Sequence, residues 1–198
     1  MGDPKKNRRK YTKPSHPWQA GRLKEESELL KRFGLKNKKE LWKMVSIIKN
    51  VKKQAKNLIA GYSEQSEKEK KQLIARLIRL GLLGENASLD DILGLKLESI
   101  FERRLQTLVY KFGLTKSVKQ ARQFVVYGHI AINGKRVNVP SYLVKKEEES
   151  KVSFYINSKL NREDHPERTI QKIKEEIKEE KKNIEQPVEE KLVEVEAK

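Results

Sequence analysis

SVKQARQFVVYGHIAINGKRVNV, residues 117–139, is the stretch that decides the fold. Ser117 followed three residues later by Gln120 is typical of a capping box, and Gly128 ends the helix that this box opens. Asn133-Gly134 then separates alternating apolar residues, which is the strongest short-range signal for a hairpin with a type I′ turn. The stretch therefore predicts a helix followed directly by a β-hairpin.

The flanking segments extend this unit on both sides. Residues 98–112 predict one helix with an apolar inward face, and Gly113 ends it. Pro140 ends the second strand of the hairpin, and residues 142–144 and 152–156 predict further short strands. The sequence thus predicts helix, loop, helix and hairpin in one unit.

The charge of this unit is one-sided. The segment from Arg103 to Lys146 contains ten basic residues and no acidic residue. Because a solvated surface normally mixes both signs, a face without carboxylates indicates a phosphate partner. If the unit packs compactly, its polar and basic side chains can share one face. The candidates for phosphate contact are Arg103, Arg104, Lys116, Ser117, Lys119, Gln120, Arg122, Lys135 and Arg136.

The segment before this unit predicts three helices. The first covers residues 22–33 and the third covers residues 63–80. The second begins at Asn37, which with Glu40 three residues later resembles a capping box, and it ends at Gly61. The second helix carries an apolar stripe at helical spacing, which indicates core packing. That stripe comprises Leu41, Met44, Ile48, Val51, Ala55 and Leu58. On its opposite side, Lys49, Lys53 and Lys56 form an exposed basic stripe available to phosphate.

The first twenty residues form a basic arm that contains three prolines and should be extended. One interpretation is a disordered basic tail or a nuclear-localisation-like run. The nearby aromatic residues favour an arm that folds onto RNA, with rings stacking while cations pair with phosphates. The cations concerned are Lys5, Lys6, Arg8, Arg9 and Lys10.

The whole composition narrows the function class. The 198 residues include 45 Lys and Arg, 28 Asp and Glu and no Cys, which gives a net charge of +17. The longest apolar run is only the four residues 124–127, so we expect no membrane span and no signal peptide. Without Cys there is no disulfide framework and no thiolate zinc site. A cytoplasmic protein with a polyanionic partner is the leading class.

Several motifs resemble a known family. Residues 102–107, 113–114, 119–122 and 128–137 (ERRLQT, GL, KQAR and GHIAINGKRV) closely resemble the S-four RNA-binding domain. The opening MGDPKK, His16-Pro17-Trp18 and residues 34–42 are similar to archaeal small-subunit ribosomal proteins of the S-four family, and the resemblance spans residues 1–157. Some bacterial members bind zinc through N-terminal cysteines, which are absent here, so we expect no metal and no cofactor.

The resemblance implies a structural, non-enzymatic component of the small ribosomal subunit. Such a protein would bind small-subunit rRNA as a primary binder, help nucleate assembly of the subunit body near the side where mRNA enters, and support translation and its accuracy. It would be cytoplasmic and ribosome-bound, with an S-five family protein as a neighbour and mRNA as a further contact. By matching position, the implied RNA contacts are Arg103, Arg104, Lys116, Ser117, Lys119, Gln120, Arg122 and Lys135.

Two rival classes remain open. An RNA-modifying enzyme can carry the same module, but it needs a catalytic domain, and the chain has only four Asp and no Gly-rich phosphate loop. Its three His residues lack metal-ligand spacing, and adjacent Asp90 and Asp91 fit the first turn of a capped helix better than a metal site. A free-standing RNA chaperone or regulator would use the same contacts as a ribosomal protein.

We therefore predict a mostly α fold with a small β component (α+β). The expected organisation is a basic arm over residues 1–20, a helical domain over 21–100, an S-four RNA-binding module over 101–160 and a charged tail over 161–198. In the tail, residues 167–185 predict a marginal charged helix, and the acidic end predicts disorder. Because an acidic segment cannot lie on rRNA without penalty, we expect the tail to point to solvent or to a basic neighbour.

Overall fold

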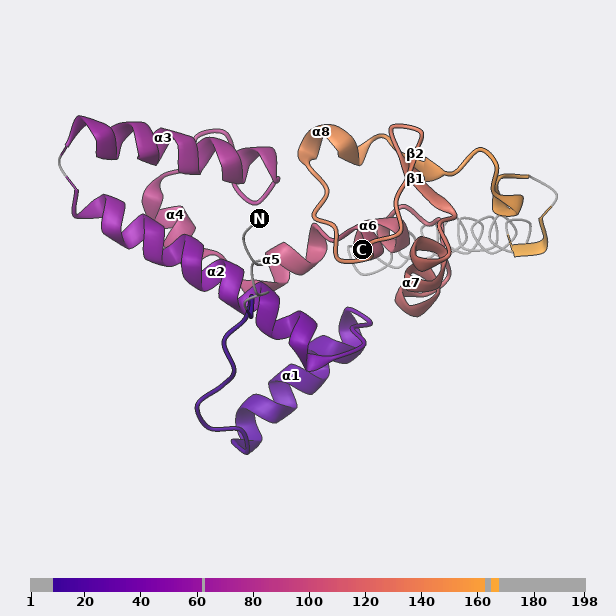
Figure 1. Cartoon of the computed structure of the whole chain (residues 1–198), viewed down its shortest axis with the longest axis horizontal. Helices are drawn as coiled ribbons and strands as arrows, with labels where there is room; N and C mark the ends of the chain where they lie inside the picture. Colours follow the sequence, from indigo (N-terminus) through magenta and orange to yellow (C-terminus); the bar gives the residue numbers. More distant parts are fainter. Residues whose placement is uncertain (1–8, 62, 163–164, 168–198) are drawn as a thin grey trace, which may run out of the picture.

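The computed structural model describes residues 9–61, 63–162 and 165–167. Helices dominate these ranges, and one small antiparallel sheet lies in the second half of the chain (Figure 1). This confirms the predicted fold class. The predicted features at Lys5, Lys6, Arg8 and residues 168–198 lie outside the described residues.

The first half of the chain is built around the 22-residue helix α2, Lys38–Ile59. Figure 1 shows α1 (Ala20–Arg32) beside the first part of α2, and α3 (Glu64–Arg79) with α4 (Leu89–Gly94) beside its second part. The predicted apolar stripe of α2 faces these neighbours, because Leu41, Met44, Ile48 and Ala55 are buried. One continuous stripe on α2 thus serves two small cores.

A buried carboxylate also fastens α1 to α2. Glu26 of α1 accepts hydrogen bonds from Arg22 at 2.7 Å and from the Trp42 indole at 3.1 Å, and Lys38 lies 3.3 Å from its second oxygen. Burial alone would raise the pKa of Glu26, but these donors outweigh burial and hold the pKa below its ordinary value. No local pattern in the sequence indicates this contact, because Glu26 and Trp42 lie 16 positions apart.

The capping predictions have mixed outcomes. Ser88 and Asp91 form a reciprocal capping box at α4, and Asp90 lies in the same first turn, as predicted for these adjacent aspartates. Asn37 is the N-cap of α2, as predicted, but its side chain accepts no capping hydrogen bond. The expected box with Glu40 is therefore wrong, because the Glu40 carboxylate instead contacts two arginines from the second half of the chain.

The single helix predicted over residues 98–112 is also wrong. The structure divides it into α5 (Leu97–Glu102) and α6 (Leu105–Lys111). The break lies at Arg104, whose φ of −73° and ψ of 140° are extended and whose backbone forms a bridge with Leu143. Periodicity alone could not show this break, because apolar spacing continues across it while the pairing partner lies almost forty residues away.

The hairpin forms as predicted. Asn133 and Gly134 have φ values of 54° and 74°, as a type I′ turn requires, and Ile132 pairs with Lys135 across it. The strands are β1 (Ile130–Ile132) and β2 (Lys135–Arg136), so the second strand ends before Val139. Strand β3 (Val152–Phe154) pairs with the other edge of β1, which gives the order β2-β1-β3.

Two predicted strand segments are only partly strand. Residues 142–144 contribute a single bridge to Arg104 rather than a strand, and β3 ends at Phe154 rather than at residue 156. Helix α8 (Lys146–Glu149) lies between them, and the 3₁₀ turn η1 (Lys159–Asn161) follows β3. Helices α6 and α7 (Val118–Val126) pack with the sheet around a separate core. That core includes Leu105, Leu108, Val109, Ala121, Val125, Ile130 and Phe154.

The described part of the N-terminal arm has no helix before Ala20. It lies against α2, because the Thr12 N–H donates to the Ser46 hydroxyl at 3.1 Å and the Tyr11 ring lies 6.0 Å from the Trp42 ring. Trp18 is 88% exposed, so this aromatic residue stays available to a partner.

Candidate nucleic-acid interface

The start of α7 gathers most of the predicted contacts of the second half. The Ser117 hydroxyl caps the helix by accepting from the Gln120 N–H at 3.2 Å. The Lys116 N–H in turn donates to the Gln120 side-chain oxygen at 2.8 Å. The cap therefore fixes both the helix start and the orientation of the Gln120 amide, while Lys119 projects into solvent from the first turn.

A cleft of about 400 Å³ separates α7 from α1 and the α1–α2 connection. We call it the α1–α7 cleft. Its lining carries four cations and no carboxylate, so it attracts an anion such as a phosphate group. It is lined by Ser27, Leu30, Lys31, Gly34, Leu35, Lys36, Lys119 and Arg122.

Gln106 of α6 holds the two walls of this cleft together. Its buried side-chain nitrogen lies 3.3 Å from the Phe33 carbonyl oxygen, 3.0 Å from that of Gly34 and 3.1 Å from that of Val118. Since Phe33 and Gly34 end α1 while Val118 begins α7, one amide joins both walls. Gly34 has a φ of +57°, and a Cβ there would meet the Gln106 nitrogen at 3.0 Å.

A charged cluster lies behind the cleft. Glu40 of α2 accepts from Arg122 at both oxygens, at 2.7 Å and 3.2 Å, and from Arg104 at 2.8 Å on the second of these oxygens. Burial would raise the pKa of Glu40, but the hydrogen bonds from Arg122 and Arg104 outweigh it and keep the pKa below its ordinary value. Because one carboxylate meets two guanidinium groups, the cluster keeps a net positive charge beside the cleft.

The position of Arg104 differs from the expected phosphate contact. Its side chain is 1% exposed, pairs with Glu40 and lies over the Phe101 ring at 5.7 Å. A guanidinium in this position cannot reach a phosphate, because protein surrounds it. The structure thus gives Arg104 contacts within the protein, between the two halves of the chain, in place of the exposed position that a phosphate contact was expected to have.

Arg103 and Arg136 also lie away from the α1–α7 cleft. Arg103 pairs with Glu149 at 2.6 Å, and its side chain is only 13% exposed. Arg136 is exposed but donates to the Tyr127 carbonyl oxygen at 3.0 Å, across Gly128. The expected single face is therefore divided: Lys119 and Arg122 line the cleft, and Arg103 and Arg136 do not.

The other predicted cations lie on separate surfaces. Lys135 follows the hairpin turn and is exposed, and its side chain has no hydrogen bond or ion pair among the described residues. Lys49, Lys53 and Lys56 are exposed on α2, as predicted. Lys49 also lines a groove of about 370 Å³ under the arm, together with Lys13 and Arg22. The arm residues Arg9 and Lys10 are exposed.

Sequence reasoning missed Lys31 and Lys36 on the cleft and Lys13 in the groove. The first two flank the Gly34 that ends α1, and lysines at a helix end are usually ordinary surface residues. The available signal was that Lys36 lies within residues 34–42, one of the segments that carried the family resemblance, and that Lys31 lies just before it. Only the contact between α1 and α7, through Gln106, places them opposite Lys119.

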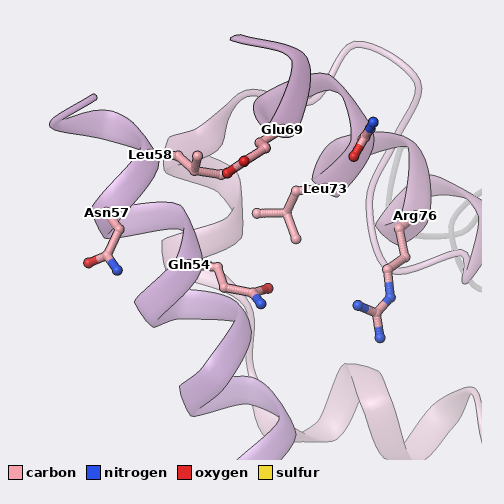
Figure 2. Close-up of a pocket in the computed structure, with 7 residues that line it drawn as sticks. Gln54, Asn57, Leu58, Glu69, Leu73 and Arg76 are labelled. Atoms are coloured by element: carbon pink, nitrogen blue, oxygen red, sulfur yellow. The ribbon is translucent and has the colours of Figure 1, made fainter. Parts of the chain in front are cut away.

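A further groove lies between α2 and α3, with a volume of about 340 Å³ (Figure 2). Glu69 and Arg76 both line it, along with amides and leucines, so it lacks the single sign of charge that marks the α1–α7 cleft. Within the described ranges, no three His, Cys, Asp or Glu residues are grouped to hold a metal ion. No described helix is both long and apolar enough to cross a membrane.

His129 is a packing residue rather than part of the cleft. Its Nδ1 lies 2.8 Å from the Ser158 hydroxyl, and its ring meets Phe124 edge-on at 6.0 Å. Burial, with smaller effects from Arg136 and His165, lowers the pKa of His129. Of the two roles that the sequence left open for this residue, packing is the one with contacts in the structure.

Known proteins give an independent comparison. A family model described as the S4 domain matches residues 103–150. The chain is 54% identical over 170 residues to small ribosomal subunit protein uS4 of Methanococcus aeolicus, a match covering 85% of this chain and 96% of that protein. It is 47% identical over 163 residues to the protein of the same name from Methanothermobacter thermautotrophicus, covering 82% and 95% respectively.

These matches confirm the resemblance from which the sequence analysis argued. The S4 domain match contains α6, α7 and the hairpin, which are the elements that the deciding stretch predicted. The matches to the two relatives cover 85% and 82% of the chain and so extend the similarity into its helical first half, where α1 and the α1–α2 connection form the other wall of the cleft. The chain belongs to the uS4 family of small ribosomal subunit proteins.

Proposed function

We propose that this protein is a structural component of the small ribosomal subunit that binds small-subunit rRNA as a primary binder. The observation that carries this proposal is the α1–α7 cleft, where Lys31, Lys36, Lys119 and Arg122 converge without a lining carboxylate. Membership of the uS4 family supports the same function. The protein then works in the cytoplasm, bound to the ribosome, and contributes to translation.

The mechanism is recognition of folded RNA by its backbone and shape. Lysine ammonium groups act as point charges toward phosphates, and Lys119 and Lys36 reach the cleft from opposite walls. The rigid contact between Gln106 and both walls fixes the distance between these cations before RNA binds. A preformed spacing selects a particular fold of the backbone rather than a base sequence.

Further contacts belong to the same proposal. The arm cations, the basic stripe of α2 and Lys135 would extend the RNA surface beyond the cleft. The proposed organisation remains an arm over 1–20, a helical domain over 21–100, a module over 101–160 and a tail over 161–198. The proposal also includes a role in nucleating the subunit body and in the accuracy of translation. It places the protein near the side where mRNA enters, in contact with mRNA and with an S-five family protein.

The rival classes have less support. A family of structural ribosomal proteins is not an enzyme family, so the protein is not an RNA-modifying enzyme. A free-standing chaperone would use the same cleft but would not stay with the subunit. Sedimentation separates these alternatives: the proposal expects near-stoichiometric association with small subunits after a moderate salt wash. A protein found mostly free of subunits would refute it.

A further inference from the structure

The carboxylate of Glu167 lies against the start of α7. Its Oε2 is 2.6 Å from the Lys116 ammonium and 3.1 Å from the Gln120 side-chain nitrogen. The sequence-based expectation placed the tail in solvent or on a neighbour, and most of the tail lies outside the described residues. Glu167 itself contacts the protein's own predicted RNA-binding residues.

The two donors that hold Glu167 are arranged for an anion. The Lys116 N–H occupies the oxygen of the Gln120 amide at 2.8 Å, which leaves the amide nitrogen directed at Glu167. The positive end of a nine-residue helix adds to the field of the ammonium. Hydrogen bonds from Lys116 and Gln120 hold the pKa of Glu167 below its ordinary value, so the bound group is a carboxylate anion near neutral pH.

A phosphodiester presents the same chemistry to these donors. Like a carboxylate, it has two oxygens that share a negative charge and accept hydrogen bonds from an ammonium and an amide. Lys116 and Gln120 are both among the residues predicted to contact RNA, yet Glu167 occupies them in the free protein. A carboxylate and a phosphate cannot both occupy the Lys116 and Gln120 donors, because two anions at this distance repel each other.

We propose that Lys116 and Gln120 form an RNA-phosphate site and that Glu167 competes with RNA for it. This inference rests on the proposed function, since the displacing ligand is a phosphate of the bound rRNA. Glu167 keeps the site oriented in the free protein and leaves it when a phosphate arrives. Glu167 thereby lowers the affinity for any RNA that must place a phosphate at this position, including the bound rRNA.

The size of the effect follows from exposure. The side chains of Lys116 and Glu167 are 30% and 39% exposed, and partly exposed ion pairs are weak. Glu167 is therefore a weak competitor, and its removal should strengthen rRNA binding by about two- to fivefold. An effect of this size tunes affinity without preventing assembly.

The test uses the full chain with one charge removed at a time. Glu167→Gln removes the competing charge, and Glu147→Gln is the matched control. Glu147 is exposed on α8 and has no hydrogen bond or ion pair among the described residues. Both variants change the net charge equally, so a difference between them reports the position rather than the charge. Dissociation constants are measured with full-length archaeal small-subunit rRNA, folded in magnesium, and with an unrelated RNA of equal length.

Three outcomes decide between the proposals. Tighter rRNA binding by Glu167→Gln, with Glu147→Gln equal to the wild type, supports competition at the site. Equal affinities of all three proteins for rRNA overturn the competition but leave the proposed function intact. A wild-type protein that does not prefer its rRNA to the unrelated RNA overturns the proposed function, and the competition with it.

A double-mutant cycle separates competition from a change in structure. With Lys116→Ala as background, Glu167→Gln should no longer increase rRNA affinity, because the contested ammonium is absent. Circular dichroism and thermal unfolding check that the variants keep the fold. An increase that persists without Lys116 would contradict the assignment of the site.

Discussion

The guanidinium of Arg104 and the carboxylate of Glu40 meet at 2.8 Å, although the two residues lie 64 positions apart. Glu40 lies in the first turn of α2, and Arg104 occupies the break between α5 and α6. The pair therefore connects the helical first half to the unit that carries the hairpin. Arg122 joins from α7 and extends this connection to one wall of the α1–α7 cleft.

Loss of the Glu40 carboxylate should destabilise the fold strongly. Glu40→Gln leaves the buried Arg104 without its counter-charge, which costs about 3 kcal/mol of the free energy of unfolding. Urea unfolding measures the change. Glu98→Gln is the control, because Glu98 pairs with Arg32 at the exposed surface and its loss should cost less than about 1 kcal/mol. Equal losses in both variants would contradict a buried connection.

The Glu40 carboxylate should also make the free energy of unfolding depend on pH in the acid range. Its pKa lies below the ordinary value of 4.5, so the unfolded chain takes up its proton first as the pH falls. The contribution of Glu40 is therefore complete above pH 4.5 and is lost as the pH falls through the folded pKa. We expect the stability gap between wild type and Glu40→Gln to narrow below pH 4.5 in unfolding curves. A gap independent of pH in that range would refute this origin.

Gln106 should affect rRNA affinity without contributing charge. Gln106→Leu leaves the Phe33, Gly34 and Val118 carbonyl oxygens without this donor, which costs roughly 1–3 kcal/mol of stability. Because the cleft walls lose their common contact, rRNA affinity should fall several-fold while the dependence on salt stays unchanged. The same change at exposed Gln54 on α2 is the control. A changed salt slope would show that cations had been displaced as well.

Lys119 should contribute to the salt dependence of binding. Each phosphate neutralised by a cation adds roughly 0.7–0.9 to the slope of log affinity against log salt. Lys119→Ala should therefore reduce the slope by nearly one unit, as measured by rRNA binding at several salt concentrations. Lys68→Ala removes the same charge from the exposed side of α3 and should leave the slope unchanged. Identical slopes in both variants would place Lys119 away from the RNA.

Gly128 should resist substitution for two separate reasons. Its φ of +74° disfavours a side chain, and a Cβ there would collide with the Arg136 guanidinium, which donates to the Tyr127 carbonyl oxygen. Gly128→Ala should cost about 1–2 kcal/mol from the backbone alone and more when Arg136 must move. In an Arg136→Ala background, only the backbone cost should remain, as thermal unfolding can show. Equal costs in both backgrounds would exclude the collision.

Local signals in the sequence were sufficient for most of the elements. The cap at Ser117, the Asn133-Gly134 turn and the apolar stripe of α2 each depend on residues close together in the chain. The helix break at Arg104 and the lost capping role of Glu40 escaped prediction, because each depends on a partner many residues away. The candidate site followed the same division. Lys119 was found from its neighbours, and Lys31 and Lys36 were not.

The sequence by itself therefore determined most of the elements, the family resemblance and the absence of carboxylates between Arg103 and Lys146. Only the tertiary structure decided which cations are buried or paired and which line the α1–α7 cleft. It buried Arg104 against Glu40, paired Arg103 with Glu149 and placed Lys36 opposite Lys119 across a cleft. The physical reason is that secondary structure follows from short-range backbone geometry, whereas the exposure of a charge depends on which distant segments pack around it.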